Sequence, residues 1–203
     1  MTNLSRTGAS SLVVYGEPQS GKTAMMICLT AKLLDDGYDT VIHLLNDSVD
    51  LLQQSLERFR LAGLAPAPKN ITELSAPLIP QGGPAIVFCK KNKHDLGALT
   101  AATAGRDSLV IVDDEADYAS PNSKVNAGKK TKINELIENL LSSGGHYVGV
   151  TATPARLNLN STFNNSAEKW VQFRPHDQYT GQDVFFGEQD VAPYRRVLLV
   201  GCS

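Results

Sequence analysis

The sequence predicts an α/β domain in which a mostly parallel sheet carries helices on both faces. Short apolar runs alternate with segments whose apolar residues recur every three or four positions, and this alternation is typical of strand–helix–strand units. The predicted strands are apolar throughout rather than at every second position, as expected where both faces of a sheet are covered. A chain of 203 residues is long enough for one sizeable domain with an appended segment.

The individual elements follow from local patterns along the chain. An apolar run at residues 12–15 is the first strand, and apolar residues at helical spacing predict a helix over 24–34. The run 40–45 is a second buried strand, after which Asp47 or Ser48 is placed to cap a helix. The apolar stripe of that helix is Val49, Leu52, Leu56 and Phe59. Further strands are predicted at residues 85–89, 109–112 and 146–150, with helices at 94–101 and 133–141.

Three regions interrupt this pattern. Residues 62–84 hold five of the ten prolines, so we expect a surface excursion with one short strand near 71–74. Residues 119–130 form a polar linker, and 195–200 are an apolar run typical of a last strand. We therefore divide the chain into a flexible lead-in at 1–10, a main domain at 11–160 and an appended segment at 161–203.

Composition narrows the range of partners. The net charge is −2, from 19 basic and 21 acidic residues, so any nucleic-acid binding must come from local patches rather than from a global positive field. The cysteines Cys28, Cys89 and Cys202 form no C-x-x-C pair, and the first two lie in apolar runs. They indicate reduced, buried thiols in a cytoplasmic protein. The sequence contains neither a signal peptide nor an apolar run of about eighteen residues, so we expect no membrane partner.

A phosphate-binding loop is the most specific motif. Residues 16–23 read G-E-P-Q-S-G-K-T directly after the first strand and fit G-x-x-x-x-G-K-[ST]. Glycine lets the backbone turn so that successive N–H groups face phosphate oxygens. In this motif Lys22 reaches the β- and γ-phosphates and the Thr23 hydroxyl is a ligand for Mg²⁺, while the following helix adds its dipole.

The loop therefore predicts that the protein binds a nucleoside triphosphate, with ATP and Mg²⁺ as the expected ligands. The alternative is an ordinary glycine-rich turn, which the preceding strand and the following helix disfavour. The predicted nucleotide-binding residues are Gly16, Glu17, Pro18, Gln19, Ser20, Gly21, Lys22, Thr23 and Ala24.

A second chemical signal lies at the end of the strand at 109–112, where the chain continues Asp113-Asp114-Glu115-Ala116-Asp117. In NTPases an acidic residue at this place holds Mg²⁺ and an adjacent carboxylate polarises the attacking water. We assign Asp114 to the metal, with Asp113 left open, and Glu115 to catalysis together with Lys22. The alternative is a solvated acidic turn, which the phosphate loop upstream makes less plausible.

Three motifs in this order resemble the first motor domain of superfamily-two helicases. They are the phosphate loop, the run Asp114-Glu115-Ala116-Asp117, and a strand that ends in Thr151-Ala152-Thr153-Pro154. The resemblance implies a RecA-like ATPase domain in which Thr151, Ala152 and Thr153 couple the nucleotide state to the nucleic-acid path. It also implies a second RecA-like domain, which would supply arginines to the ATP site and which residues after Val200 are too few to form.

Several details are similar to one branch, the Z-one domain ATPases of bacterial restriction and defence systems. They include Gln19-Ser20, the doubled Asp113-Asp114, the run Ala119-Ser120-Pro121-Asn122 and the segments Tyr179-Thr180-Gly181 and Phe185-Phe186-Gly187. The similarity implies a helicase-like subunit that hydrolyses ATP to move along or remodel DNA, with a nuclease or another defence subunit as partner. The fragment alone is expected to hydrolyse ATP weakly.

Nucleic-acid contacts are the least specific part of the reading. In related motors, the ends of the second and third strands touch the phosphodiester backbone, and here they carry Asn46 and the pair Lys90 and Lys91. Helix capping is an equal alternative for Asn46, and a solvated face is an equal alternative for the lysines. Two rival functions also remain open at this point: a nucleotide-gated module that recruits a nuclease without translocating, and a viral DNA-packaging ATPase.

Overall fold

The computed structural model describes residues 11–74, 83–106, 108–117, 132–142, 145–154, 170–176 and 179. These residues form one sheet of seven strands, in the order β3-β4-β2-β5-β6-β1-β7, and every pair of neighbours is parallel. The strands are β1 (Ser11–Tyr15), β2 (Thr40–Leu45), β3 (Lys69–Asn70), β4 (Ala85–Lys90), β5 (Leu109–Asp114), β6 (His146–Thr151) and β7 (Trp170–Gln172).

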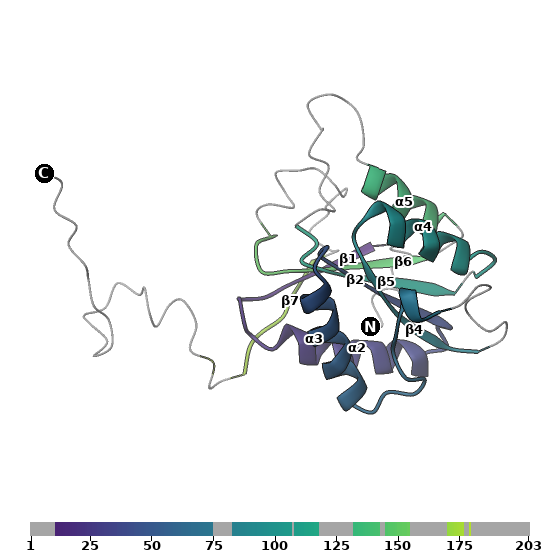
Figure 1. The fold of residues 1–203 in the computed structure, drawn as a ribbon. Coiled ribbons are helices and arrows are strands. Elements are labelled where there is room, and N and C mark those ends of the chain that lie inside the picture. Colours follow the sequence, from purple (N-terminus) through teal and green to yellow (C-terminus); the bar gives the residue numbers. More distant parts are fainter. Residues whose placement is uncertain are drawn as a thin grey trace, which may run out of the picture.

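Helices cover both faces of this sheet (Figure 1). On one face lie α2 (Lys22–Asp35) and α3 (Val49–Leu61), and on the other lie α4 (Lys93–Ala102) and α5 (Lys132–Leu141). Successive residues of β2 alternate between the two faces of the sheet. Val41 belongs to the core under α2 and α3, and Ile42 belongs to the core under α4 and α5. The α/β class with a parallel sheet and helices on both faces is thus confirmed.

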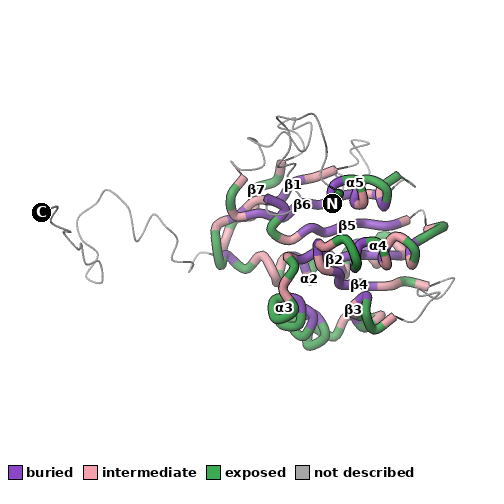
Figure 2. The backbone as a smooth tube through the Cα atoms, turned by 45° about the horizontal axis from the view of Figure 1, so that its top comes forward, coloured by how far each residue is buried: buried purple, intermediate pink, exposed green. Residues whose placement is uncertain are grey.

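Strand β2 is buried along its whole length, and β5 is buried at every residue but its last (Figure 2). His43 in β2 is only 2% exposed, and its ring packs against those of Phe59 and Phe88, which also contact each other. The hydroxyl of Thr30 donates to the carbonyl of Met26 and lies 2.9 Å from His43 Nε2. Because a hydroxyl has a single hydrogen to donate, the ring nitrogen donates to Thr30. Burial lowers the pKa of His43 to about 3, so the ring is neutral at physiological pH.

Local signals explain where most elements begin and end. Helix α3 begins after Ser48, whose Oγ accepts a hydrogen bond from the N–H of Leu51, and α4 begins after Asn92, whose side chain accepts from Asp95. Gly37 has φ of +91°, which suits the turn after α2.

Four sequence expectations need correction. The short strand comes earlier than residues 71–74, as β3, and a 3₁₀ turn follows at Ile71–Glu73. Val49, at the first residue of α3, is 68% exposed and does not belong to the buried stripe of that helix. Cys28 is exposed, unlike the buried Cys89. Strand β7 pairs with β1, so the sheet extends past the expected domain boundary at residue 160.

Several expectations fall outside the described residues: the lead-in at 1–10, the linker at 119–130, the phenylalanine pair at 185–186 and the strand at 195–200. Within the described part of the chain, no helix has the length and apolar character needed to cross a membrane.

Candidate functional site

The predicted motifs meet at one edge of the sheet. All seven strands are parallel, so their carboxyl ends lie together, and ligands of open α/β sheets bind at that edge. The phosphate loop follows β1, the acidic run ends β5, and the threonines end β6. The N–H of Gly16 donates to the carbonyl of Thr151 at 3.1 Å, and the N–H of Ala116 donates to that of Val150 at 3.0 Å. Three motifs distant in sequence are therefore held together by their backbones.

The loop after β1 has the shape of an anion cradle. Gly21 has φ of +93°, a left-handed conformation that glycine adopts without strain, and it precedes α2 without any side-chain cap. The first N–H groups of this helix are thus left for a ligand, and its first turn carries no acidic residue. A Cβ on Gly16 would lie 3.1 Å from the carbonyl oxygen of Phe173, so the glycine is also needed for close packing.

Polar side chains of the loop are aimed inward. The ammonium of Lys22 donates to the carbonyls of Gly16 and Glu17, at 3.3 and 2.6 Å. Burial lowers the pKa of Lys22, against the opposing charges of Asp114 and Glu115. Among the described residues, the buried hydroxyl of Ser20 has no hydrogen-bond partner. An unpaired buried donor of this kind fits a phosphate oxygen.

The two aspartates at the end of β5 have different environments. Asp113 is fully buried, and its two oxygens bind Lys91 at 2.9 Å and the hydroxyl of Tyr147 at 2.5 Å. The carboxylate of Asp114 accepts, within the described part of the chain, one hydrogen bond, from the N–H of Glu115. Burial, and then the charge of Glu115, raise the pKa of Asp114 to about 6.

These residues fit a magnesium ion. The Thr23 hydroxyl and the Asp114 carboxylate are hard oxygen donors of the kind that Mg²⁺ prefers. The Asp114 carboxylate is the less engaged of the two aspartates, and a bound cation would favour its ionised form. Lys22 lies close enough to Asp114 for the carboxylate charge to act on the ammonium, where it opposes the lowering of the Lys22 pKa by burial. The donor set thus points to Asp114 rather than Asp113.

Glu115 is held in an unusual position. Its φ is +53°, in the left-handed region that few residues with a Cβ adopt. Its carboxylate accepts a hydrogen bond from the side-chain amide of Asn46, which follows β2. Ser48, not Asn46, caps α3, so the helix-capping alternative for Asn46 is wrong.

The end of β6 is joined to the acidic turn by side chains. Thr151 Oγ1 donates to Asp117 at 2.6 Å, and Thr153 Oγ1 donates to the other oxygen of the same carboxylate. The N–H of Thr153 in turn donates to Thr151 Oγ1 at 2.9 Å. A displacement of the acidic turn would therefore displace the end of β6, and the reverse also holds. The backbone of Ala152 lies between these two anchored residues.

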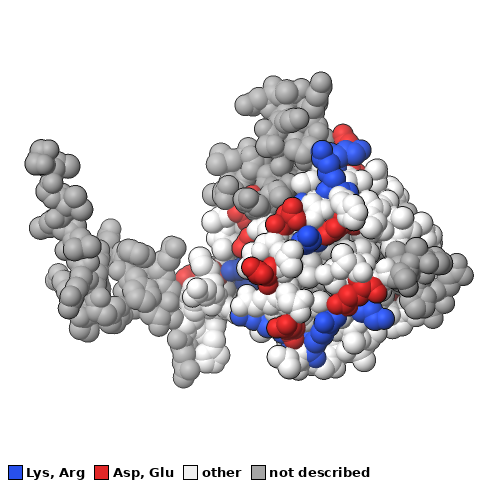
Figure 3. All heavy atoms as spheres, in the orientation of Figure 1, with Lys and Arg blue, Asp and Glu red and all other residues white. Residues whose placement is uncertain are grey.

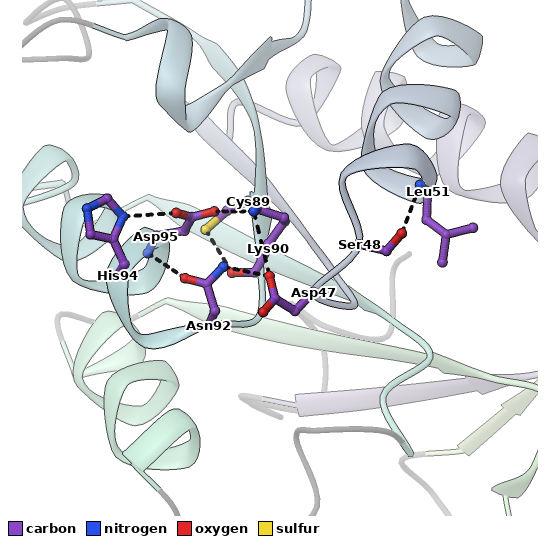
Figure 4. Close-up of polar contacts among 8 residues, drawn as sticks. All are labelled: Asp47, Ser48, Leu51, Cys89, Lys90, Asn92, His94 and Asp95. Atoms are coloured by element: carbon purple, nitrogen blue, oxygen red, sulfur yellow. Dashed lines mark hydrogen bonds and ion pairs between the residues drawn. The ribbon is translucent and has the colours of Figure 1, made fainter.

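The three predicted nucleic-acid residues have different positions. Lys91 is 2% exposed and is held by Asp113 and by backbone carbonyls, so its assignment to nucleic acid is wrong. The ammonium of Lys90 lies 3.6 Å from both Asp47 and Asp95, and 21% of its side chain is exposed (Figure 4). Lys90 therefore reaches the surface, but with two carboxylates beside it.

The face of the molecule drawn in Figure 3 is of mixed charge. On the face drawn in Figure 3, lysines and arginines are interspersed with acidic residues, and no uniformly basic area is seen among the described residues. Beside Lys90, the side chain of Asn92 donates to Asp47 at 2.8 Å and so ties the end of β4 to the end of β2 (Figure 4). On this face, the distribution of charge alone does not mark a nucleic-acid path.

Sequence reasoning missed several neighbours of the site. Tyr147 and Lys91 both bind Asp113, and Phe173 packs on Gly16. The hydroxyl of Tyr179 donates to the carbonyl of Pro18, so a segment near the end of the described chain lies against the phosphate loop. Only the lysine carried a usable signal, because it directly follows a buried strand.

Comparisons with known proteins are consistent with this geometry. The model of the SWI2/SNF2 ATPase family matches residues 2–180. The Sulfolobus solfataricus SWI2/SNF2 ATPase core in complex with dsDNA resembles the chain with a TM-score of 0.52 at 15% identity, over 83% of this chain and 31% of that one. The genome packaging NTPase B204 from Sulfolobus turreted icosahedral virus 2, in complex with ATP-gammaS, gives 0.40 at 14% identity, over 71% and 64%. No curated protein sequence matches.

Proposed function

The chain belongs to the SWI2/SNF2 ATPase family, and from this premise we propose that it hydrolyses ATP with Mg²⁺ in order to move along or remodel DNA. The family makes it an ATPase domain of the superfamily-two, helicase-like type. The observation that carries the proposal is the junction of the phosphate loop, the Asp114–Glu115 turn and the Thr151–Thr153 segment at one sheet edge. The chain spans 31% of the first similar structure, so the proposal concerns one part of a motor.

Binding of the triphosphate is assigned to the loop after β1. The N–H groups at the start of α2 and the ammonium of Lys22 would bind the β- and γ-phosphates. The buried Ser20 hydroxyl would gain a phosphate oxygen as its partner. Thr23 and Asp114 would hold Mg²⁺. When bound, the ion neutralises charge that develops on the phosphates.

Hydrolysis is assigned to Glu115. In NTPases a residue at this place orients the attacking water, and its carboxylate can accept the water proton. The amide of Asn46 holds the same carboxylate and so restricts the directions from which it can accept. Glu115 follows β5 at the carboxyl edge of the sheet, and its charge acts on the ammonium of Lys22.

Coupling is assigned to Thr151, Ala152 and Thr153. Both threonine hydroxyls donate to Asp117, two residues after Glu115. A change at the catalytic turn when the γ-phosphate leaves would be transmitted through Asp117 to the end of β6. In a motor this displacement would alter contacts with DNA.

DNA is proposed as the partner on two grounds. The solved SWI2/SNF2 core named above is in complex with dsDNA, and superfamily-two motors contact the backbone at the strand ends that carry Asn46 and Lys90. Lys90 is the better candidate, because part of its side chain is exposed. Three further parts of the proposal rest on the sequence motifs and composition alone. They are a second RecA-like domain, a nuclease partner in a restriction or antiphage system, and a cytoplasmic location.

The proposal is tested by measuring ATP hydrolysis with and without Mg²⁺ and double-stranded DNA. We expect Mg²⁺-dependent turnover that rises when DNA is added, in the protein that carries the proposed second RecA-like domain. Turnover that responds to a protein partner and not to DNA would favour the nucleotide-gated module instead. Failure to bind ATP in titration calorimetry would contradict the assignment of the phosphate loop.

A further inference from the structure

Lys91 is a buried cation that the proposed mechanism does not use. Lysine is almost never fully buried unless it is paired, and the side chain of Lys91 has no exposed surface. It follows β4 directly and reaches the end of β5, where its ammonium donates to Asp113 Oδ1 at 2.9 Å. It also donates to the backbone carbonyls of Asp114 and Glu115, at 2.8 and 3.0 Å.

These contacts fix the backbone of the catalytic turn. An ammonium has three N–H donors, and two of the acceptors named above are the carbonyls of the residues assigned to the metal and to the water. Glu115 has the left-handed φ of +53°, which residues with a Cβ avoid unless their surroundings impose it. A cation that binds two successive carbonyl oxygens is suited to impose such a turn.

Stability alone is a poor explanation for this arrangement. Replacing a buried ion pair by apolar side chains of similar volume is often neutral or stabilising, so the pair of Lys91 and Asp113 is no efficient way to hold a core together. Asp113 is itself held by Tyr147. The aspartate thus orients the ammonium, and the ammonium orients the two carbonyls.

We propose that Lys91 is a positioning residue for hydrolysis: it holds the backbone of Asp114 and Glu115 so that both carboxylates face the bound triphosphate. This inference rests on the proposed ATPase function. In this role Lys91 does not contact the substrate. Loss of Lys91 should therefore affect the Mg²⁺-dependent steps, while the phosphate loop still binds nucleotide.

The test uses the variant Lys91→Met, which keeps the length of the side chain and removes its donors. A shift of about 1 Å at a catalytic group costs on the order of 10²-fold in rate, so we expect kcat to fall by about this factor. ATP affinity without Mg²⁺ should stay within about twofold of wild type, and the gain in affinity on adding Mg²⁺ should shrink.

A second pair of variants separates positioning from folding. Lys91→Met leaves the buried Asp113 charge unpaired, which destabilises the fold, whereas Lys91→Met with Asp113→Asn removes both charges and keeps an acceptor for Tyr147. We expect the double variant to regain thermal stability but not hydrolysis. Asp113→Asn alone loses the charge that orients the Lys91 ammonium but leaves the ammonium its two carbonyl acceptors, so its kcat should fall, and by less than that of Lys91→Met.

Recovery of hydrolysis together with stability in the double variant would overturn the proposal, as would a normal kcat in Lys91→Met. If the wild type itself does not hydrolyse ATP, the proposed function fails, but the Mg²⁺-dependent part of ATP affinity still tests Lys91. An identical Mg²⁺ effect in wild type and in the double variant would then overturn the positioning role.

Discussion

Thr151 Oγ1 donates a hydrogen bond of 2.6 Å to Asp117, across 34 positions of the sequence. Thr153 donates to the second oxygen of the same carboxylate, so one buried aspartate receives both threonines that end β6. Asp117 lies two residues beyond Glu115. Glu115 is assigned to water activation, and the threonines belong to the segment assigned to coupling. The hydrogen bonds between Asp117 and the threonines therefore connect the catalytic turn to the coupling segment.

Thr151→Val should separate these two segments. Valine keeps the shape of threonine but cannot donate, and loss of a partner from a buried carboxylate costs on the order of 1–3 kcal/mol. ATP affinity should be unchanged, while stimulation of hydrolysis by DNA should fall. Thr103→Val is the control, because it removes a buried hydroxyl at the end of α4, away from the site. Equal stimulation in the two variants would count against the coupling role.

Lys22→Ala should weaken ATP binding more than tenfold. It removes the cation assigned to the β- and γ-phosphates, and a charge-assisted hydrogen bond contributes about 1.5–3 kcal/mol. Lys32→Ala is a matched control from the other end of α2, where the lysine is exposed and pairs with Asp36. Titration calorimetry that gives the same affinity for both variants would refute the loop assignment.

Lys90→Ala should weaken DNA binding and lower the slope of log K against log salt by about 0.9, the value for one phosphate contact. Asp47→Asn should have the opposite effect on affinity, because it removes a carboxylate that lies 3.6 Å from the ammonium. Lys132→Ala, on the exposed surface of α5, is the control. If Lys90→Ala leaves the salt slope unchanged, Lys90 does not contact a DNA phosphate and is only a solvated surface residue.

His43 should make stability depend on pH. Its pKa is lowered from 6.5 to about 3 by burial, so between these values the unfolded chain binds a proton that the folded chain does not. Stability is therefore fully present above about pH 6.5 and is lost as pH falls, by on the order of 1 kcal/mol per pH unit. Urea unfolding at pH 7.5 and 5 measures this loss.

The matched variant is His43→Gln, which keeps a donor for Thr30 but does not titrate. It should be less stable at pH 7.5, because it loses the ring contacts with Phe59 and Phe88. Its loss of stability between pH 7.5 and 5 should nevertheless be smaller than that of the wild type. The same loss in both proteins would show that His43 is not the titrating group.

The sheet and the phosphate loop were predictable because their signals are contiguous. Strand β2 was expected at residues 40–45 and is found there, since a short, mostly apolar run is typical of a strand in a parallel sheet that is covered on both faces. The glycine at position 21 was predicted from the motif and has the positive φ that the turn requires.

The contacts that organise the site were not predictable in this way. Lys91 lies in a lysine-rich run, which favours solvent exposure, and its partner Asp113 is 22 positions away. The partner of Asn46 is 69 positions away. Such pairings depend on the strand order, which places β2 between β4 and β5, and no local pattern contains that order. Strand β7 was missed because three residues are too few for a period.

The most direct test of the account is the comparison of wild type with Glu115→Gln. Glutamine keeps the size of glutamate and its contact with Asn46 but cannot accept a proton. ATP affinity with Mg²⁺, measured by calorimetry, should stay within a few-fold. Single-turnover hydrolysis of the bound ATP should fall by about 10²–10⁴, the range for loss of a general base. Hydrolysis by Glu115→Gln at the wild-type rate would contradict the assignment of Glu115 and, with it, the mechanism proposed here.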